Sequence, residues 1–305
     1  MAPGAAGSPV VAVVGPTAAG KSDLAVELAL RLGGEAINAD SMQLYRGMDI
    51  GTAKLTPAER RGVPHHLLDV WDVTETASVA EYQRMARPLI DRMLAAGTVP
   101  VLVGGSGLYV RATLDDLEFP GTDPLIRARL ETELAELGSG ALHQRLKELD
   151  PVAAEAVLPS NGRRVVRALE VIELSGRPFS ATMPSYDAVY PSVQIGLQVP
   201  RPLLDERIAL RVHRMWEAGF PGEVRALAAR GLADGRTAGR ALGYAQVLRF
   251  LAGEWTEDQA VDETIRATRR FARRQESWFR RDPRVHWLPY DDPGLVERAV
   301  RLVRS

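Results

Sequence analysis

More than any other feature, one octapeptide constrains what this 305-residue chain can fold into: Gly15-Pro16-Thr17-Ala18-Ala19-Gly20-Lys21-Ser22. It matches in full the pattern of a phosphate-binding loop, in which glycines let the backbone turn its N–H groups inward towards phosphate oxygens. The helix expected after the loop adds partial positive charge at its N-terminus. Lys21 would add a full charge, and the Ser22 hydroxyl would be placed to ligate Mg²⁺. We therefore predict that this loop binds a phosphate-bearing small molecule.

Apolar strands and amphipathic helices alternate around the loop. Residues 9–14 are apolar and β-branched, which indicates a buried strand, and residues 22–32 carry leucines along one helical stripe. Further strands are expected at residues 35–39 and 99–103, with a helix at residues 79–96 between them. This succession predicts an α/β fold with a P-loop kinase-like parallel sheet flanked by helices.

A wholly helical block follows. Its helices are expected at residues 123–137, 141–149, 151–156 and 163–174. Residues 193–199 then alternate like a strand, and the remainder of the chain has a helical pattern. A helical block between two strand regions favours an insertion over a tandem domain. We therefore predict a P-loop α/β core of residues 9–120 and 190–305, interrupted by an all-helical insertion domain of residues 121–189.

The composition limits the possible chemistry and partners. The chain has no cysteine, which excludes disulfides, thiolate zinc sites and a catalytic thiol, and which fits a cytoplasmic location. Its net charge is -1, so a nucleic-acid partner would need a local basic patch. Residues 1–8 lack the features of a signal peptide, and no apolar run is long enough to span a membrane. Nothing resembles a dimer seam, so we expect a monomer.

The residues that follow the later strands bear on which phosphate compound is bound. In a P-loop NTPase a second apolar strand usually ends in an aspartate that organises Mg²⁺ and water. Strand 99–103 is followed instead by Gly104 and Gly105, whereas Asp40 follows strand 35–39. This argues against a nucleotide-dependent RNA-binding switch. Small-molecule kinases also place an aspartate near this point, so an ATP-dependent kinase stays open as an alternative.

Several motifs occur in a fixed order along the chain: the phosphate loop, then residues 40–45, 48–54, 64–69, 104–109, 167–171 and 243–244. Through them the chain resembles the tRNA dimethylallyltransferases, also called tRNA isopentenyltransferases, in their bacterial form. It covers the chain from about Val10 to Leu288. It implies that a dimethylallyl group moves from dimethylallyl diphosphate to N6 of adenosine 37, next to the tRNA anticodon, giving N6-isopentenyladenosine and diphosphate. Mg²⁺ and the loop would hold the diphosphate where a kinase holds the phosphates of ATP.

The resemblance also implies roles for individual residues. Asp40 would be the general base for the adenine amine. Lys21 and Thr17 would stabilise the leaving diphosphate, and the planar guanidinium of Arg211 would grip it. The adenine must leave its stack to react. Residues expected to contact the tRNA anticodon stem-loop are Asp40, Ser41, Met42, Gln43, Ser106, Arg127, Arg129, Arg163, Arg164, Val165, Val166, Arg167, Arg240, Ala241, Leu242, Gly243, Tyr244 and Ala245.

Three other features have more ordinary explanations to weigh. His65 and His66 are adjacent, so their side chains point apart, and we expect a structural rather than a metal-binding role. Trp278 is expected in the core. A helical stretch is dense in arginine, and we expect it to contact an RNA backbone rather than to be merely solvated. This arginine face comprises Arg266, Arg269, Arg270, Arg273, Arg274, Arg280 and Arg281.

Overall fold

A computed structural model of the chain describes residues 8–182 and 187–305. The chain divides into two compact units. The first contains the residues up to Leu114 and from Ala188 onward, and the second runs from Asp115 to Asp187. The second unit starts and ends a little earlier than the predicted boundaries of residues 121–189, because the Asp116 N–H donates to the Asp187 carbonyl and ties its two ends together.

The first unit is built on a six-stranded sheet in the order β3-β2-β4-β1-β5-β6. Every strand pair in it is parallel. The strands are β1 (Val10–Val14), β2 (Gly34–Asn38), β3 (His65–His66), β4 (Val99–Gly104), β5 (Ser192–Gln198) and β6 (Val285–Pro289). Parallel strands bring their carboxyl ends to one edge of a sheet. The segments that follow β1, β2 and β4 therefore meet there, and they contain the phosphate loop, Asp40 and Ser106.

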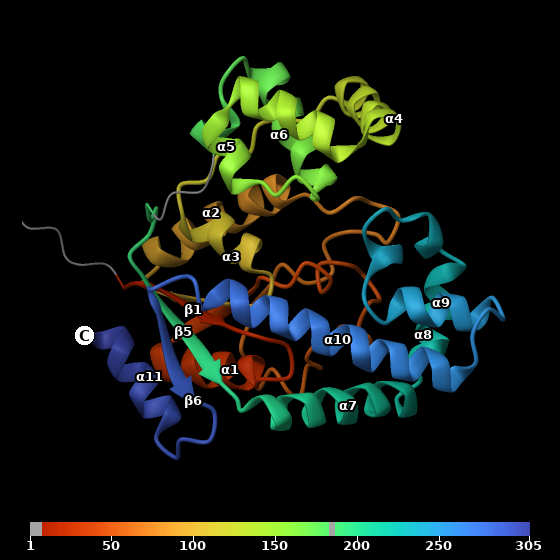
Figure 1. The fold of residues 1–305 in the computed structure, drawn as a ribbon. Coiled ribbons are helices and arrows are strands. Elements are labelled where there is room, and N and C mark those ends of the chain that lie inside the picture. The colour runs from red at the N-terminus through yellow and green to blue at the C-terminus, as the bar shows by residue number, and fades with distance from the viewer. Residues whose placement is uncertain (1–7, 183–186) are drawn as a thin grey trace, which may run out of the picture. The chain divides into compact units, whose positions relative to one another are not determined.

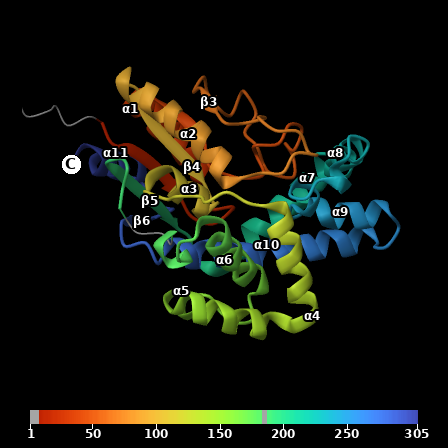
Figure 2. The same ribbon diagram turned by 90° about the horizontal axis from the view of Figure 1, so that it is seen from above.

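Helices cover both faces of this sheet, as Figures 1 and 2 show. The helices of the first unit are α1 (Lys21–Leu32), α2 (Val79–Ala95), α3 (Gly107–Leu114), α7 (Arg201–Glu217), α8 (Phe220–Ala228), α9 (Tyr244–Leu251), α10 (Glu257–Phe279) and α11 (Leu295–Arg304), of which α8 and α9 lie beyond the sheet (Figure 1). Successive side chains of a strand point to opposite faces. In β1, Ala12 and Val14 accordingly pack in the core with α2 and α3, whereas Val11 and Val13 pack in the core with α1 and α11. Helix α10 lies beside α7 and α9 (Figure 1).

The second unit is helical throughout its described elements. It contains α4 (Pro124–Leu149), α5 (Pro151–Ala156), α6 (Gly162–Ser175) and a short 3-10 helix (Phe179–Thr182). Gly138 interrupts α4 with a φ of 80°, where the sequence predicted a break between two helices. Asp123, Asp150 and Asn161 cap the three α-helices, each accepting a backbone N–H with its side chain. The predicted fold class, a P-loop-type parallel α/β sheet with a helical insertion, is thus confirmed.

Two strands and one tryptophan differ from the sequence predictions. Strand β3 has only two residues, and β6 forms the opposite edge of the sheet within a stretch predicted as helical. Short edge strands carry little periodic signal. The expectation that Trp278 is a core residue is wrong, because it is 41% exposed while its neighbour Phe279 is the buried one. In the described ranges no helix combines the length and apolarity needed to cross a membrane.

Candidate active site

The phosphate loop forms the turn from β1 to α1. Gly15 and Gly20 have φ angles of 128° and 97°, a region that favours glycine, and Ala18 also adopts a positive φ of 63°. Gly20 caps α1 without a side-chain hydrogen bond, so the first N–H groups of this helix remain available to an anion. Lys21 folds back so that its Nζ donates to the Pro16 carbonyl at 2.7 Å. Ser22 lies in the first turn of α1 and, like Lys21, lines a cavity beside the loop.

This cavity has a volume of about 420 Å³. The phosphate loop, the end of β2 and helix α7 each contribute to its wall. Thr17, Lys21, Asp40, Gln43 and Arg211 therefore line one space, although the chain separates them by up to 194 positions. Its size is within the range of small-molecule sites.

Charge and burial combine at Lys21. Burial lowers the pKa of its ammonium from 10.5 to about 8, Asp40 opposes this shift, and Arg211 adds to it. Burial thus removes water from the Lys21 ammonium and makes its charged form less stable. An anion placed there would restore the charged form, because an opposite charge raises the pKa of a lysine.

Binding of inorganic diphosphate should therefore weaken as the pH rises above about 8, where the ligand-free Lys21 loses its proton. Calorimetry over this range, in two buffers of different ionisation enthalpy, should detect proton uptake on binding. The ligand itself also titrates, so the same series on Lys21→Met isolates the lysine. An equal pH dependence in both proteins would contradict the assignment.

Arg211 reaches the phosphate loop from α7. Its Nη1 donates to the Thr17 hydroxyl at 3.4 Å. Burial lowers the pKa of the guanidinium, and Asp23 partly compensates. Lys21 and Arg211 thus both contact the phosphate loop, and their charged donors are of the kind that binds phosphate strongly.

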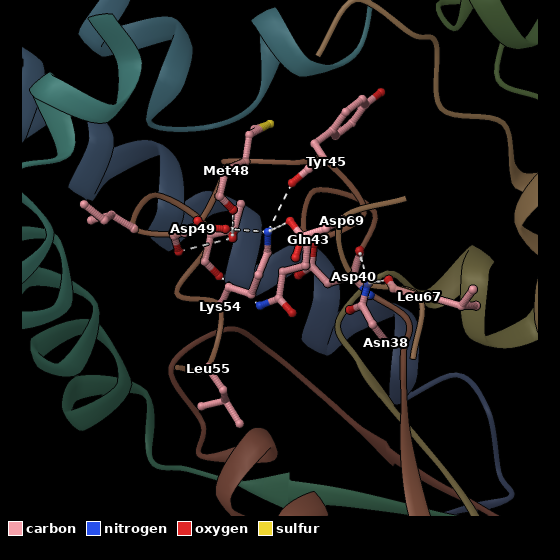
Figure 3. Close-up of polar contacts among 12 residues, drawn as sticks. Asn38, Asp40, Gln43, Tyr45, Met48, Asp49, Lys54, Leu55, Leu67 and Asp69 are labelled. Carbon is pink, nitrogen blue, oxygen red and sulfur yellow. Dashed lines mark hydrogen bonds and ion pairs between the residues drawn. The ribbon is translucent and has the colours of Figure 1, made fainter. Parts of the chain in front are cut away.

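Asp40 is held in place by Asn38, the last residue of β2. The Asp40 N–H donates to Asn38 Oδ1 at 2.8 Å, and Asn38 Nδ2 donates to the carbonyls of Asp40 and Leu67 at 3.0 and 2.9 Å (Figure 3). Asp40 Oδ1 accepts from the Met42 N–H at 2.9 Å. The carboxylate is therefore fixed by the backbone of its own loop. The sequence did not identify Asn38, although a buried amide at the end of a strand is a recognisable signal.

Lys54 joins two loop segments that line the cavity. Its Nζ donates to Asp49 Oδ1 at 2.6 Å, to Asp69 Oδ1 at 2.7 Å and to the Tyr45 carbonyl at 3.1 Å (Figure 3). Its side chain is only 3% exposed, whereas both carboxylates are about half-exposed. Residues 48–54 and 64–69 carried the family resemblance without a stated role. The structure shows that they are linked by this buried ammonium.

Lys54→Met should lower the free energy of unfolding by about 1–2 kcal/mol, because it leaves two neighbouring carboxylates without their shared cation. Thermal or urea unfolding measures this change. Lys147→Met, the same substitution at an exposed position of α4, is the matched control. Equal stability of the two variants would show that the Lys54 network contributes nothing measurable.

Glu223 on α8 supports the same loop from another side. Its carboxylate accepts from three successive backbone N–H groups, those of Asp49, Ile50 and Gly51, at 3.0, 2.7 and 3.2 Å. It also accepts from the Tyr244 hydroxyl at 2.6 Å. Glu223 was not predicted, because a single glutamate on a helix gives no sequence signal for a bond about 170 residues away.

Tyr244 and its neighbours, predicted to contact tRNA, are mostly buried in the structure. The Tyr244 side chain is buried, packs edge-on against the Phe220 ring at 4.9 Å, and has its pKa raised by burial and by Glu223. Ala241 and Gly243 are also buried. Of the other residues in this segment, Arg240 is exposed and Leu242 and Ala245 are half-buried.

Ser41 and Ser106 lie together beside Asp40. Ser106 Oγ accepts from the Ser41 N–H at 3.2 Å and donates to Ser41 Oγ at 3.3 Å. Both serines are half-buried, as are Met42 and Gln43. Gln43 donates to the Thr52 carbonyl at 3.1 Å. Of these residues, Gln43 lines the same cavity as Asp40, whereas Ser41, which directly follows Asp40 in the chain, is bonded to Ser106.

In the helical unit the predicted contact residues separate into three groups. Val165 and Val166, also predicted to contact tRNA, are buried in its core, since the period of α6 turns them inward. Arg127 and Arg167 both pair with the fully buried Glu170, at 2.5 and 2.8 Å. Of the remaining arginines, Arg129 pairs with Glu133 and Glu173, and Arg163 and Arg164 are exposed.

The histidine pair has structural partners. His66 Nε2 lies 2.6 Å from Glu35 Oε2, and His65 Nδ1 lies 2.8 Å from the Val63 carbonyl oxygen. Within the part of the chain that the structure describes, no three His, Cys, Asp or Glu side chains cluster in a way that could hold a metal ion.

The arginine face of α10 is partly neutralised. Arg266 and Arg270 pair with Glu263, and Arg280 pairs with Glu276. Arg269 donates to the Asp205 carbonyl instead. The exposed positive charge is thus smaller than the sequence suggested, with Arg273 and Arg274 remaining on the surface.

Comparison with known proteins identifies the family of this chain. Residues 43–282 match the family model described as IPP transferase. The chain is 74% identical over 301 residues to a tRNA dimethylallyltransferase of Thermobifida fusca, covering 97% of this chain and 94% of that protein. It is also 74% identical over 290 residues to a tRNA dimethylallyltransferase of Streptomyces coelicolor, covering 95% and 92% of the two chains.

Solved structures show the same relationship. The full-length tRNA isopentenylpyrophosphate transferase of Bacillus halodurans is 42% identical, with a TM-score of 0.72 and coverage of 97% of this chain and 95% of that one. A eukaryotic dimethylallyltransferase acting on tRNA shares the fold at 24% identity, with a TM-score of 0.83 over 95% of this chain and 77% of that one. The extent of the family match and of these identities shows that the chain belongs to the IPP transferase family.

Proposed function

We propose that this protein transfers a dimethylallyl group from dimethylallyl diphosphate to N6 of adenosine 37 in tRNA. The observation that carries the proposal is the placement of Asp40, Lys21 and Arg211 around one cavity, with the phosphate loop on its wall. An anion-binding loop and a nearby carboxylate are what the displacement of diphosphate by a weakly basic amine requires. The names of its relatives agree with this reaction.

The donor would bind with its diphosphate on the phosphate loop. Three kinds of donor would stabilise the charge that develops on the leaving oxygen: the N–H groups at the start of α1, the Lys21 ammonium and the Arg211 guanidinium. Thr17 is tied to Arg211 and would add a hydroxyl. Because these groups are already ordered by the fold, little reorganisation is needed when the bond breaks.

The donor set of the cavity also fits Mg²⁺. This ion commonly keeps several waters and binds through substrate phosphates with one or two protein ligands. Ser22 offers such a ligand at the start of α1, next to the diphosphate position. When bound, Mg²⁺ would neutralise charge on the departing diphosphate.

At the acceptor side Asp40 would take the proton. The lone pair of N6 forms a bond to C1 of the dimethylallyl group as the C1–O bond breaks, and the electron pair of that bond leaves with the diphosphate. The N6 proton passes to the Asp40 carboxylate. After the adenine leaves its stack, Ser41 and Ser106 would face it beside Asp40.

Arg211→Ala should raise the KM for dimethylallyl diphosphate and lower turnover by about ten- to a hundredfold, since a hydrogen bond to a charged group contributes about 1.5–3 kcal/mol. Steady-state kinetics with the donor varied at saturating tRNA measures both quantities. Arg304→Ala, at an exposed position of α11, is the control. An Arg211→Ala variant with the wild-type profile would remove this residue from the site.

The exposed arginines of the first unit are proposed to contact the tRNA backbone. Replacing Arg273 and Arg274 by glutamine should flatten the plot of log binding constant against log salt concentration by about one per lost phosphate contact. The paired control replaces Arg301 and Arg304 of α11, which are also exposed. A slope that changes equally in both double variants would indicate a merely solvated face. Arg163, Arg164 and Arg240 remain proposed contacts of the same kind.

A further inference from the structure

Gln275 of α10 connects the phosphate loop to the loop that follows β4. Gln275 is only 5% exposed. Oε1 accepts from the Thr17 N–H at 2.9 Å, and Nε2 donates to the Gly105 carbonyl at 2.9 Å. One buried amide therefore bridges two loops whose residues lie 258 and 170 positions away in the sequence.

Trp278, one turn further along α10, packs against the segment that follows β4, at Gly107. A Cβ atom added at Gly105 would collide with the Gln275 amide, and one added at Gly107 would collide with the Trp278 indole. Both glycines are therefore needed for this close approach. Helix α10 thus holds the residues on either side of Ser106.

Ser106 carries this restraint to the acceptor side. Its hydroxyl accepts from the Ser41 N–H and donates to the Ser41 hydroxyl. Ser41 directly follows Asp40, the proposed base. Hydrogen bonds therefore link Thr17 on the donor side through Gln275 to Gly105, and Ser106, the next residue of the backbone, is bonded to the loop beside Asp40.

We propose that Gln275 is a positioning residue that fixes the bound diphosphate relative to the acceptor base, with Trp278 supporting it. This inference rests on the proposed prenyl transfer. Displacement at carbon requires the reacting atoms about 3–3.5 Å apart, and an error of about 1 Å can lower the rate about a hundredfold. Gln275 need not touch either substrate, because it sets the spacing of the two loops that hold them.

Gln275→Met removes both hydrogen bonds at similar volume. At saturating concentrations of both substrates, its single-turnover rate should fall by about tenfold or more. The dissociation constants for dimethylallyl diphosphate and for tRNA should change far less, since each loop keeps its own ligand groups. Gln83→Met is the matched control, because Gln83 donates to the Ala112 carbonyl at 2.9 Å between α2 and α3. It should retain the wild-type rate.

Two further variants keep the inference testable if Gln275→Met is unstable. Gln275→Asn keeps the buried amide but is too short to reach both partners, so it should show a similar loss of rate. In a cycle with Ser106→Ala, the effect of Gln275→Met should shrink, because both changes act on one linkage. Independent, multiplicative effects, or a loss confined to binding, would overturn the positioning role. A wild-type protein that produces no prenylated tRNA would overturn the proposed function itself.

Discussion

Replacing Asp40 by asparagine is expected to lower the single-turnover rate of prenyl transfer by about 10²–10⁴-fold, because the amide cannot accept the N6 proton. Binding of tRNA should be largely retained. The reason is structural: the introduced amide keeps an oxygen for the Met42 N–H, and the backbone at this position remains bonded to Asn38. Single-turnover kinetics at saturating substrates and a separate tRNA binding titration measure the two effects.

Asp291→Asn supplies the matched control for this prediction, since it makes the same change at an exposed position. It should behave as the wild type in both assays. A parallel loss of rate and of tRNA affinity in the Asp40 variant would refute its role as the base. It would indicate that Asp40 instead organises the surface on which the tRNA binds.

The second large effect is expected for Lys21→Met, which removes the buried ammonium from the phosphate loop. The rate of transfer should fall by about 10²–10³-fold, the usual cost of losing one preorganised donor to a developing anion. Methionine largely preserves the length of the side chain, so the loop glycines can keep their conformation. Only the charge and the bond from Nζ to the Pro16 carbonyl are lost.

A donor with a better leaving group would distinguish this role from simple loss of folding. If Lys21 stabilises charge on the leaving oxygen, its removal should matter less when that charge is more stable. Lys147→Met again supplies the matched substitution outside the cavity. A Lys21→Met variant that binds the donor normally and reacts at the wild-type rate would show that the lysine has no part in the reaction.

Local features explain what the sequence predicted. Strand β1, helix α1 and the glycines of the phosphate loop follow from apolar periodicity and from a short motif, and each is encoded in consecutive residues. The aspartate after β2 could be placed at the same edge of the sheet because parallel strands end together. The core of the candidate site was predictable on these grounds.

Long-range contacts explain what the sequence left out. Gln275 and Glu223 are single polar residues on amphipathic helices, and only the folded chain brings them to Thr17 and to the Ile50 N–H. The helical period of α6 directs Val165 towards a core, but its predicted contact with tRNA came from the family resemblance and not from this period. The motif at Tyr244 likewise gave no sign of the bond from its hydroxyl to Glu223.

The most direct test of the proposed reaction is mass analysis of tRNA nucleosides after the protein is incubated with unmodified tRNA and dimethylallyl diphosphate. The tRNA should contain adenosines at positions 36 to 38, and a parallel reaction should contain ATP in place of the prenyl donor. We predict N6-isopentenyladenosine at position 37, formed together with diphosphate and only with the prenyl donor. No prenylated adenosine, with phosphate transferred from ATP to a small molecule when metabolites are added to the parallel reaction, would contradict the proposed prenyl transfer and favour a kinase.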